Sequence, residues 1–236
     1  QPETTSAIAT LEPGYALTEQ NQFLRYEHVR KVRSSLLDKT NGVSTGYAVR
    51  LNGSANEKFG LARSISVMPG DVINAEVYAK YIDTNSSNWT AALNTLMSQI
   101  ASGTAPSGTV IDGPGYSSST SSFSYSGLLN RDGDTGTGPK AYLNWLIFDR
   151  DINFLNGGYS RLTTAARETG QDVAHEKLSA LINIKQAGYV YIYLSNEEGT
   201  PLDVFFDDFK VEHIESPVIQ INGYYPYGMG AYTYLR

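Results

Sequence analysis

Two runs of alternating apolar and polar residues, joined by a tight turn, constrain the fold of this chain more than any other feature. Residues 60–67 alternate, Met68-Pro69-Gly70-Asp71 is typical of a turn, and residues 72–82 alternate again. Because successive side chains of a strand point to opposite faces, each run predicts a strand with one buried and one solvated face. The simplest interpretation is an antiparallel hairpin.

Further strand patterns follow along the chain. A nearly continuous apolar run over residues 141–150 predicts a strand covered on both faces. The strongest pair is predicted at 189–194 and 204–211, joined by turn-forming residues at 196–201. Weaker signals predict strands at 23–32, 47–51, 159–162 and 180–184, and a helical turn around 171–178. Many short strands with hairpin turns predict an all-β fold, an antiparallel β-sandwich.

The distribution of Pro, Gly, Ser and Thr suggests the domain boundaries. Residues 1–20 show no sustained period and are interpreted as a linker or irregular lead-in, whereas 21–215 form one β-sandwich module. A Ser-, Thr- and Gly-rich segment at about 85–138 is interpreted as a long insertion, with a short helix between Asn88 and Gly103. Residues 216–236 form a Tyr-rich junction.

Charge and composition exclude several classes of protein. The formal net charge is −6, and the basic residues form nothing denser than the scattered Arg25, Arg30, Lys31 and Arg33, so no nucleic-acid partner is expected. We interpret that basic cluster as a solvated strand or turn rather than an anion site. The chain has no cysteine, and no stretch approaches the ~20 apolar residues of a membrane span.

Two blocks resemble the jelly-roll carbohydrate-binding modules of secreted bacterial proteins, which have a galactose-binding-like fold. The first comprises residues 47–51, 62–71 and 77–80 around the Pro-Gly-Asp turn, and the second is 204–211 with its Asp-Asp pair. The resemblance implies a jelly roll, a glycan partner and a secreted or cell-surface location. It also implies a structural calcium ion, because in such modules an aspartate of the closing strand commonly ligates one.

A second resemblance concerns the surroundings of the module. Residues 216–220 and 224–229 resemble the junction that leads into the core of RHS (YD-repeat) proteins, with Tyr227 where Phe is common. Residues 88–94 and 139–150 resemble the segment before that core in the RHS-type proteins of Bacteroidota. This resemblance implies a piece of a large surface or toxin-delivery protein. Its partners would be the rest of that polypeptide and secretion-machinery or surface proteins.

A sugar site needs exposed aromatic rings to stack on pyranose faces, with hydrogen-bonding groups beside them. Trp89, Tyr116 and Tyr125 in the insertion are the predicted ligand-binding residues. The alternative is that these rings only pack the insertion onto the sandwich. Trp145 lies in a run that is apolar on both faces and is predicted to belong to the core.

The favoured metal ligand is Asp207, which interrupts an otherwise apolar closing strand. By strict alternation Asp207 shares a face with Phe205, Phe209 and Val211, where a carboxylate is costly unless it is paired, hydrogen-bonded or bound to a cation. Calcium prefers such hard oxygen ligands. The alternative is that Asp207 caps backbone amides of the N-terminal segment. A loop at 130–136 lacks the later ligands of a calcium loop and is interpreted as an exposed acidic turn.

Signals for catalysis are sparse. His28, His175 and His213 lie far apart and form no metal-binding or nucleophile motif. Asp149 and Asp151 could form the carboxylate pair of a glycoside hydrolase, but a pair flanking an arginine is more typical of a solvated ion-pair patch. The favoured hypothesis is a non-catalytic module that either binds glycan or serves as a spacer that presents the RHS core at the cell surface. The alternatives are a purely structural or protein-interaction domain and a glycan-active hydrolase.

Overall fold

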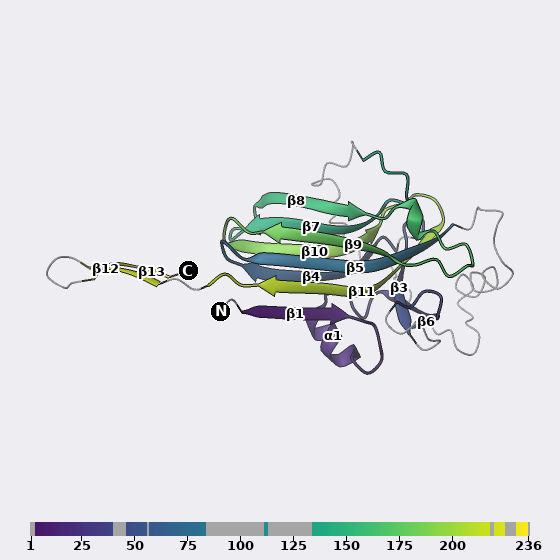
Figure 1. The fold of residues 1–236 in the computed structure, drawn as a ribbon, viewed down its shortest axis with the longest axis horizontal. Coiled ribbons are helices and arrows are strands. Elements are labelled where there is room, and N and C mark those ends of the chain that lie inside the picture. Colours follow the sequence, from purple (N-terminus) through teal and green to yellow (C-terminus); the bar gives the residue numbers. More distant parts are fainter. Residues whose placement is uncertain are drawn as a thin grey trace.

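The computed structural model of the protein describes residues 3–39, 46–55, 57–83, 111–112, 134–217, 220–224 and 230–235. In this part of the chain, strands pair into two antiparallel sheets that stack on each other, with a short helix at one edge (Figure 1). The predicted all-β sandwich is confirmed. Most of the predicted insertion, including its expected helix, lies outside the described residues.

The larger sheet has seven strands in the order β6-β2-β3-β11-β5-β9, with β1 also paired to β11. Its strands are β1 (Thr4–Ala9), β2 (Arg30–Arg33), β3 (Tyr47–Asn52), β5 (Val72–Asp83), β6 (Ile111–Asp112), β9 (Glu176–Asn183) and β11 (Leu202–Ile214). The smaller sheet has the order β4-β10-β7-β8. Its strands are β4 (Phe59–Val67), β7 (Ala141–Asp149), β8 (Phe154–Arg161) and β10 (Gly188–Asn196).

The remaining described elements are short. Helix α1 (Ala16–Gln22) follows β1, and a 3-10 turn, η2 (Thr164–Ala166), follows β8. A separate hairpin, β12 (Gln220–Tyr224) paired with β13 (Gly230–Leu235), lies within the predicted Tyr-rich junction. None of the helices in the described ranges has the length and apolar character needed to cross a bilayer.

The two strands at the Pro-Gly turn form as predicted, but they do not pair with each other. Strand β4 pairs with β10 in the smaller sheet, whereas β5 pairs with β9 and β11 in the larger one. Likewise β10 and β11, predicted as a pair, belong to opposite sheets. The predicted hairpins were wrong because two strands that face one core from opposite sides show the same alternation as two strands side by side.

The N-terminal segment is part of the sandwich and not a linker. Strand β1 pairs with β11 from Thr4 opposite Ile214 to Ala9 opposite Phe209. The buried Glu19 of α1 accepts hydrogen bonds from the backbone amide of Leu11 at 3.0 Å and the Tyr26 hydroxyl at 2.9 Å. These contacts fix the segment. They could not be predicted from the sequence, because β1 buries only two alanines and its other residues are exposed.

Several weaker predictions also needed correction. Of the strand expected at 23–32, only its end enters β2, and Leu24 forms an isolated bridge to Ala62. The helical turn expected around 171–178 is not formed, since β9 begins at Glu176. Strand β8 begins at Phe154, before the predicted start.

The main core lies between the sheets and is built from their inward faces. Val190, Ile192 and Leu194 of β10 point into it, opposite Ile73 and Val77 of β5. A second, smaller core covers part of the outer face of the larger sheet. Its members are Val32, Leu37, Ala48, Ile82 and Phe205.

A bulge in β11 changes the faces that its residues occupy. Asp207 pairs with Tyr78 and Lys210 with Glu76, so an extra residue is accommodated where Asp208 takes a φ of 49°. Asp207 therefore shares the outer face with Phe205 and Lys210. The predicted grouping of Asp207 with Phe209 and Val211 was wrong, because both of those residues lie in the main core.

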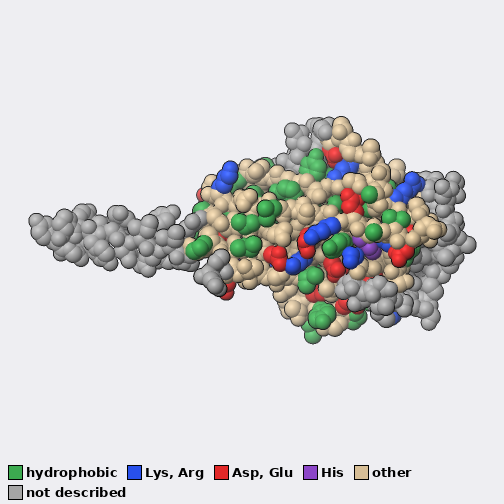
Figure 2. All heavy atoms as spheres, viewed as in Figure 1, with side chains coloured by type: hydrophobic (Ala, Val, Ile, Leu, Met, Phe, Trp, Pro, Cys, Tyr) green, Lys and Arg blue, Asp and Glu red, His purple; other side chains and the backbone are tan. Residues whose placement is uncertain are grey.

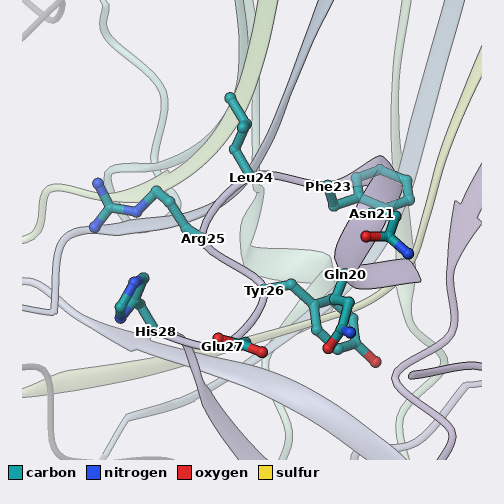
Figure 3. Close-up of a pocket in the computed structure, with 8 residues that line it drawn as sticks. All are labelled: Gln20, Asn21, Phe23, Leu24, Arg25, Tyr26, Glu27 and His28. Atoms are coloured by element: carbon teal, nitrogen blue, oxygen red, sulfur yellow. The ribbon is translucent and has the colours of Figure 1, made fainter. Parts of the chain in front are cut away.

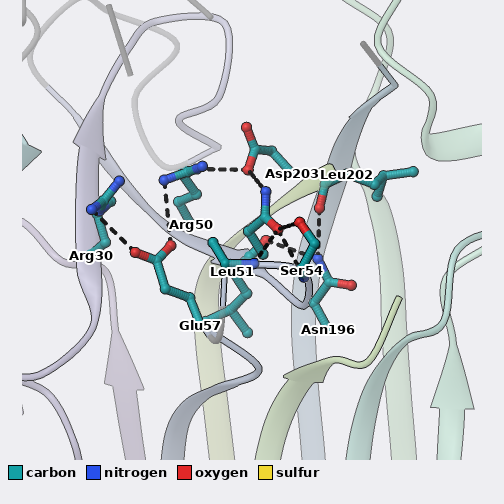
Figure 4. A network of polar contacts seen from close by, with 10 residues as sticks. Arg30, Arg50, Leu51, Ser54, Glu57, Asn196, Leu202 and Asp203 are labelled. Carbon is teal, nitrogen blue, oxygen red and sulfur yellow. Dashed lines mark hydrogen bonds and ion pairs between the residues drawn. The ribbon is translucent and has the colours of Figure 1, made fainter. Parts of the chain in front are cut away.

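A buried polar network joins the sheets at one end of the sandwich (Figure 4). Asp203 accepts hydrogen bonds from Arg50 Nε and from Asn52 Nδ2, both at 2.7 Å. Asn196 of the smaller sheet donates to the carbonyls of Leu51 and Leu202 in the larger sheet, each at 2.9 Å. Since every one of these polar groups has a partner, the network fixes how the two sheets meet.

Candidate functional site

The outer face of the four-stranded sheet carries four cross-strand rows of side chains, ordered by strand register. From β4 through β10 and β7 to β8, the first row is Ser66, Tyr189, Phe148 and Phe154, and the second is Ser64, Tyr191, Leu146 and Gly157. The third row is Ala62, Tyr193, Asn144 and Tyr159, and the fourth is Phe59, Ser195, Tyr142 and Arg161. Apolar members of the rows pack together in a cluster separate from the main core.

The first two rows form the more open part of this face, although Leu146 within them is buried, and we call them the aromatic platform. Tyr189 and Phe154 are each 38% exposed, and Ser64 and Ser66 are exposed. Tyr191 and Phe148 are half-buried. In the third and fourth rows, Ala62, Tyr193, Asn144 and Tyr142 are buried. The accessible part of the face is therefore aromatic and uncharged, with hydroxyl groups along its β4 side.

Ring contacts hold the platform in shape. Phe148 and Phe154 pack edge to face, with ring centroids 6.1 Å apart. Tyr191 leans on Tyr193 at 5.6 Å, and Tyr193 in turn contacts Phe59 at 6.1 Å. Such pairs stabilise the ring orientations, so little conformational entropy remains to be lost when a ligand stacks on them.

A charged group borders the face on the β8 side, and it is paired internally. Arg161 Nη1 lies 2.9 Å from Asp134 Oδ1, and the Tyr142 hydroxyl donates to Asp134 Oδ2 at 3.1 Å. Burial raises the pKa of Asp134, but hydrogen bonds from Arg161, the Gly136 amide and Tyr142 outweigh it and lower this pKa overall. Asp134 thus serves an ion pair within the fold, in the loop that the sequence suggested is an acidic turn.

The three aromatic residues predicted to bind ligand, Trp89, Tyr116 and Tyr125, lie outside the described residues. Trp145 packs against the main core from the inward face of β7, as predicted. The aromatic platform was missed because only aromatic residues of the insertion were considered for ligand binding, and residues 189–194 were used only to predict a strand. The signal was present in residues 189–194, where tyrosines alternate with Val190, Ile192 and Leu194.

Asp207, the predicted calcium ligand, is 1% exposed. Its Oδ2 accepts a hydrogen bond from the Lys39 amide and its Oδ1 one from the Asp208 amide, both at 2.7 Å. Burial is the main cause that raises the pKa of Asp207 to about 9, and the nearby carboxylates of Asp208 and Asp38 add to it. The contact with Lys39 is the amide capping considered as the alternative. It leaves lone pairs on both oxygens for a cation.

The carboxylates around Asp207 are of the type that binds calcium, but on their own they do not form a complete metal site. Asp38 and Asp208 both act electrostatically on the buried Asp207, so two further acidic groups lie in its neighbourhood, of which Asp208 is half-buried. Within the described ranges, however, no group of three or more His, Cys, Asp or Glu side chains has the geometry to hold a metal ion. Any further ligands would have to be carbonyl oxygens or water, which calcium accepts readily.

The proposed carboxylate pair of a hydrolase does not have the environment that general acid catalysis needs. Asp149 ends β7, and its Oδ1 accepts hydrogen bonds from the amides of Asp151 at 2.9 Å and Asn153 at 2.8 Å. Side-chain and backbone hydrogen bonds from Asn153 lower the pKa of Asp149, whereas a general acid requires a raised one. Asp149 therefore acts as the cap of the β7–β8 turn.

The three histidines have different partners. His175 Nε2 lies 3.0 Å from the Leu37 carbonyl, and burial lowers the pKa of His175 to about 4. His213 Nε2 lies 2.9 Å from Asp71 Oδ2 at the end of β11. His28 borders a groove between α1 and β2. The structure brings none of them to the aromatic platform.

Among known proteins, chains similar to this one are found only among solved structures. No family model matches the chain, and no curated protein matches it. The chain is similar to the CBM22-1–GH10 modules of endo-1,4-β-D-xylanase 10B from Clostridium thermocellum, complexed with xylohexaose. The identity is 11% and the TM-score 0.38, over 83% of this chain and 26% of that chain. It is also similar to the CBM22-1 xylan-binding domain of a Paenibacillus barcinonensis xylanase, at 9% identity and a TM-score of 0.34, over 92% of this chain and 86% of that chain.

Proposed function

We propose that this chain is a non-catalytic β-sandwich module that binds a glycan on the aromatic platform. The observation that carries the proposal is the row Ser66, Tyr189, Phe148 and Phe154, in which three partly or fully exposed rings lie side by side on β10, β7 and β8, with a hydroxyl on β4 beside them. Neighbouring strands are about 4.8 Å apart, so successive rings can contact successive parts of an extended sugar chain. The apolar faces of pyranose rings stack on such rings, and exposed hydroxyls bond the ring substituents.

The absence of charge from the two platform rows favours neutral sugar faces at this position. The neighbouring Arg161 is already paired with Asp134. A ligand that lies on the platform therefore gains stacking and hydroxyl contacts without desolvating a charge of the protein.

The test is a calorimetric screen of soluble polysaccharides against the wild-type chain and the Tyr191→Ala variant. We expect Tyr191→Ala to weaken binding by about tenfold or more, since loss of an aromatic contact at a binding site costs roughly 1–3 kcal/mol. Tyr15→Ala is the matched control, because Tyr15 is 62% exposed and precedes α1, which packs against β1 of the larger sheet. Equal affinities for all three proteins, or no binding at all, would contradict the proposal and favour a purely structural or protein-interaction domain.

We also propose that Asp207 ligates a structural calcium ion. Burial and the nearby carboxylates of Asp208 and Asp38 disfavour a negative charge on Asp207, and a divalent cation bound there would stabilise that charge. The ion would fix the segment that ends at Lys39 against β11, through oxygen ligands of Asp207 and its acidic neighbours.

Calcium binding is measured by thermal unfolding in EDTA and after adding calcium back. We expect calcium to raise the melting temperature of the wild type, because a ligand that binds only the folded state stabilises it by RT ln(1 + [L]/Kd). Asp207→Asn should abolish the shift, whereas Asp149→Asn should keep it, since Asp149 only caps an exposed turn. A melting temperature of the wild type that does not respond to calcium would contradict the site.

We propose, finally, that the module is part of a larger RHS-type protein that is secreted or located at the cell surface. The support is the resemblance of residues 216–220 and 224–229 to the junction before an RHS core. Mass spectrometry of surface-shaved and secreted proteins tests the context. Peptides of this module on a large polypeptide with YD repeats are expected, and recovery from the cytosol alone would contradict it.

A further inference from the structure

A groove beside the platform is lined by Gln20 and Asn21 at the end of α1 and by residues 23–28 between α1 and β2 (Figure 3). Its cavity volume is about 340 Å³, within the range of small-ligand sites. In Figure 3, Arg25 and His28 lie on one side of this segment and Phe23 on the other, with Leu24 pointing away from both. The groove is therefore lined by the exposed apolar Leu24 and by the guanidinium of Arg25.

The groove adjoins the face that carries the platform. The Leu24 amide donates to the Ala62 carbonyl at 2.7 Å, and the Ala62 amide donates to the Leu24 carbonyl at 3.2 Å. Leu24 thus extends the third row beyond β4, and its side chain is 50% exposed. The Arg25 guanidinium lies 6.0 Å from the ring centroid of Phe59 in the fourth row, and it interacts electrostatically with Tyr191. A ligand could therefore contact the groove and the platform together.

The electrostatics of the groove favour an anion. Burial lowers the pKa of Arg25, which means that its charge is partly desolvated and is stabilised by any anion placed next to it. Arg63 lies 5.7 Å from the Phe23 ring centroid, and its buried Nη1 has no hydrogen-bond partner in the part of the chain that the structure describes. The acidic Glu27 also lines the groove and opposes this field. In Figure 3 its carboxylate lies apart from Arg25.

The backbone at Arg25 is strained. Its φ is 67°, a left-handed conformation that non-glycine residues adopt at a cost of order 1–3 kcal/mol. Glycine would adopt it without that cost. An arginine held in this conformation is consistent with a role for its side chain that offsets the strain.

We propose that this groove is a second sugar subsite, which takes an anionic substituent of the glycan whose neutral rings lie on the platform. Arg25 would hold the carboxylate or sulfate through its planar fork of N–H donors, and Leu24 would contact the ring that carries it. The inference rests on the proposed glycan binding and adds the class of ligand, an acidic polysaccharide.

The test compares a uronic-acid polysaccharide with the same polymer after carboxyl reduction, and a sulfated polymer with its desulfated form. The readout is the ratio of affinities within each pair. We expect the wild type to prefer at least one acidic form by about tenfold, with a preference that falls as NaCl rises. The pair that shows the preference identifies the carboxylate or the sulfate.

The variants Arg25→Gly and Arg25→Lys test whether the ratio of affinities for the acidic and neutral polymers depends on the Arg25 side chain. We expect Arg25→Gly to bring the ratio near one while it folds normally, because glycine suits the positive φ. Arg25→Lys should give an intermediate ratio, since it keeps the charge without the fork. Tyr15→Ala should leave the ratio unchanged. A wild-type ratio near one, or a ratio that Arg25→Gly does not alter, would overturn the subsite while leaving glycan binding in place. Failure of every polymer to bind would overturn both.

Discussion

The outer faces of the two sheets differ in the polar and aromatic side chains that they carry. On the four-stranded sheet, the accessible rows are aromatic and uncharged. On the seven-stranded sheet, charged residues form pairs, such as Lys177 with Glu76, and the buried Lys80 lies 3.1 Å from Glu168. On the face in view in Figure 2, basic and acidic side chains lie next to one another.

This difference is the reason that the proposed glycan site is placed on the smaller sheet. Charged groups of the larger sheet such as Lys80 are engaged within the protein, and a second apolar core covers part of that face. The smaller sheet instead exposes rings that contribute little to the main core. Changes on the larger sheet should therefore alter stability without altering glycan affinity, and the following three variants test this separation.

The largest effect is expected for Asp203→Ala. It leaves Arg50 and Asn52 buried without their shared acceptor, and breaking a buried charge pair in this way costs about 3–5 kcal/mol. Urea denaturation measures the free energy of unfolding. A loss below 1 kcal/mol would show that the network is dispensable, and a matching loss of glycan affinity at a temperature where the variant is folded would break the separation.

A smaller effect is expected for Asp71→Asn. Asp71 is buried, which raises its pKa, but hydrogen bonds from the amides of Ser216 and Met68 and from His213 lower it overall. A depressed folded-state pKa stabilises the protein above the unfolded value of about 4 and ceases to do so as pH falls through the folded value. We expect the variant to lose about 1–3 kcal/mol at pH 7.

The pH dependence provides the control for this variant. Wild type and Asp71→Asn should converge in stability as the pH falls below about 4, because the wild-type carboxyl becomes protonated there. Denaturation curves at pH 7 and at acidic pH measure the difference. A gap between the two proteins that is constant across this range would contradict the assigned role of the carboxylate.

The smallest effect is expected for Lys210→Ala. Lys210 Nζ lies 2.6 Å from Glu212 Oε1, but both side chains are partly exposed, so the pair contributes less than about 1 kcal/mol. Denaturation at low and high salt checks this value. A loss comparable with that of Asp203→Ala would mean that exposed pairs, and not the buried network, hold this face together.

Much of the sandwich could be predicted because alternation reports burial. The strands around residues 60–67, 72–82, 141–150 and 189–194 formed as expected. Alternation does not report partners, which is why β4 and β5 were assigned to one sheet. It also does not report an inserted residue, so the bulge after Asp207 moved Phe209 to the other face.

The candidate site was predictable only in part. The tyrosines of residues 189–194 share one face by simple alternation, and their contrast with the aliphatic residues between them distinguishes that face. Arg25 carries no such signal, because its proximity to Phe59 depends on the bridge between Leu24 and Ala62 and on a positive φ. Contacts of this kind between distant segments come only from the assembled fold.

The central claim is that glycan binds the outer face of the smaller sheet, and amide chemical-shift mapping by NMR tests it most directly. Titration of the isotope-labelled chain with a polysaccharide that binds should shift amides of β4, β7, β8 and β10, foremost those of Ser66, Tyr189 and Tyr191. Shifts confined to β5, β9 and β11 would place the ligand on the charged face and contradict the account.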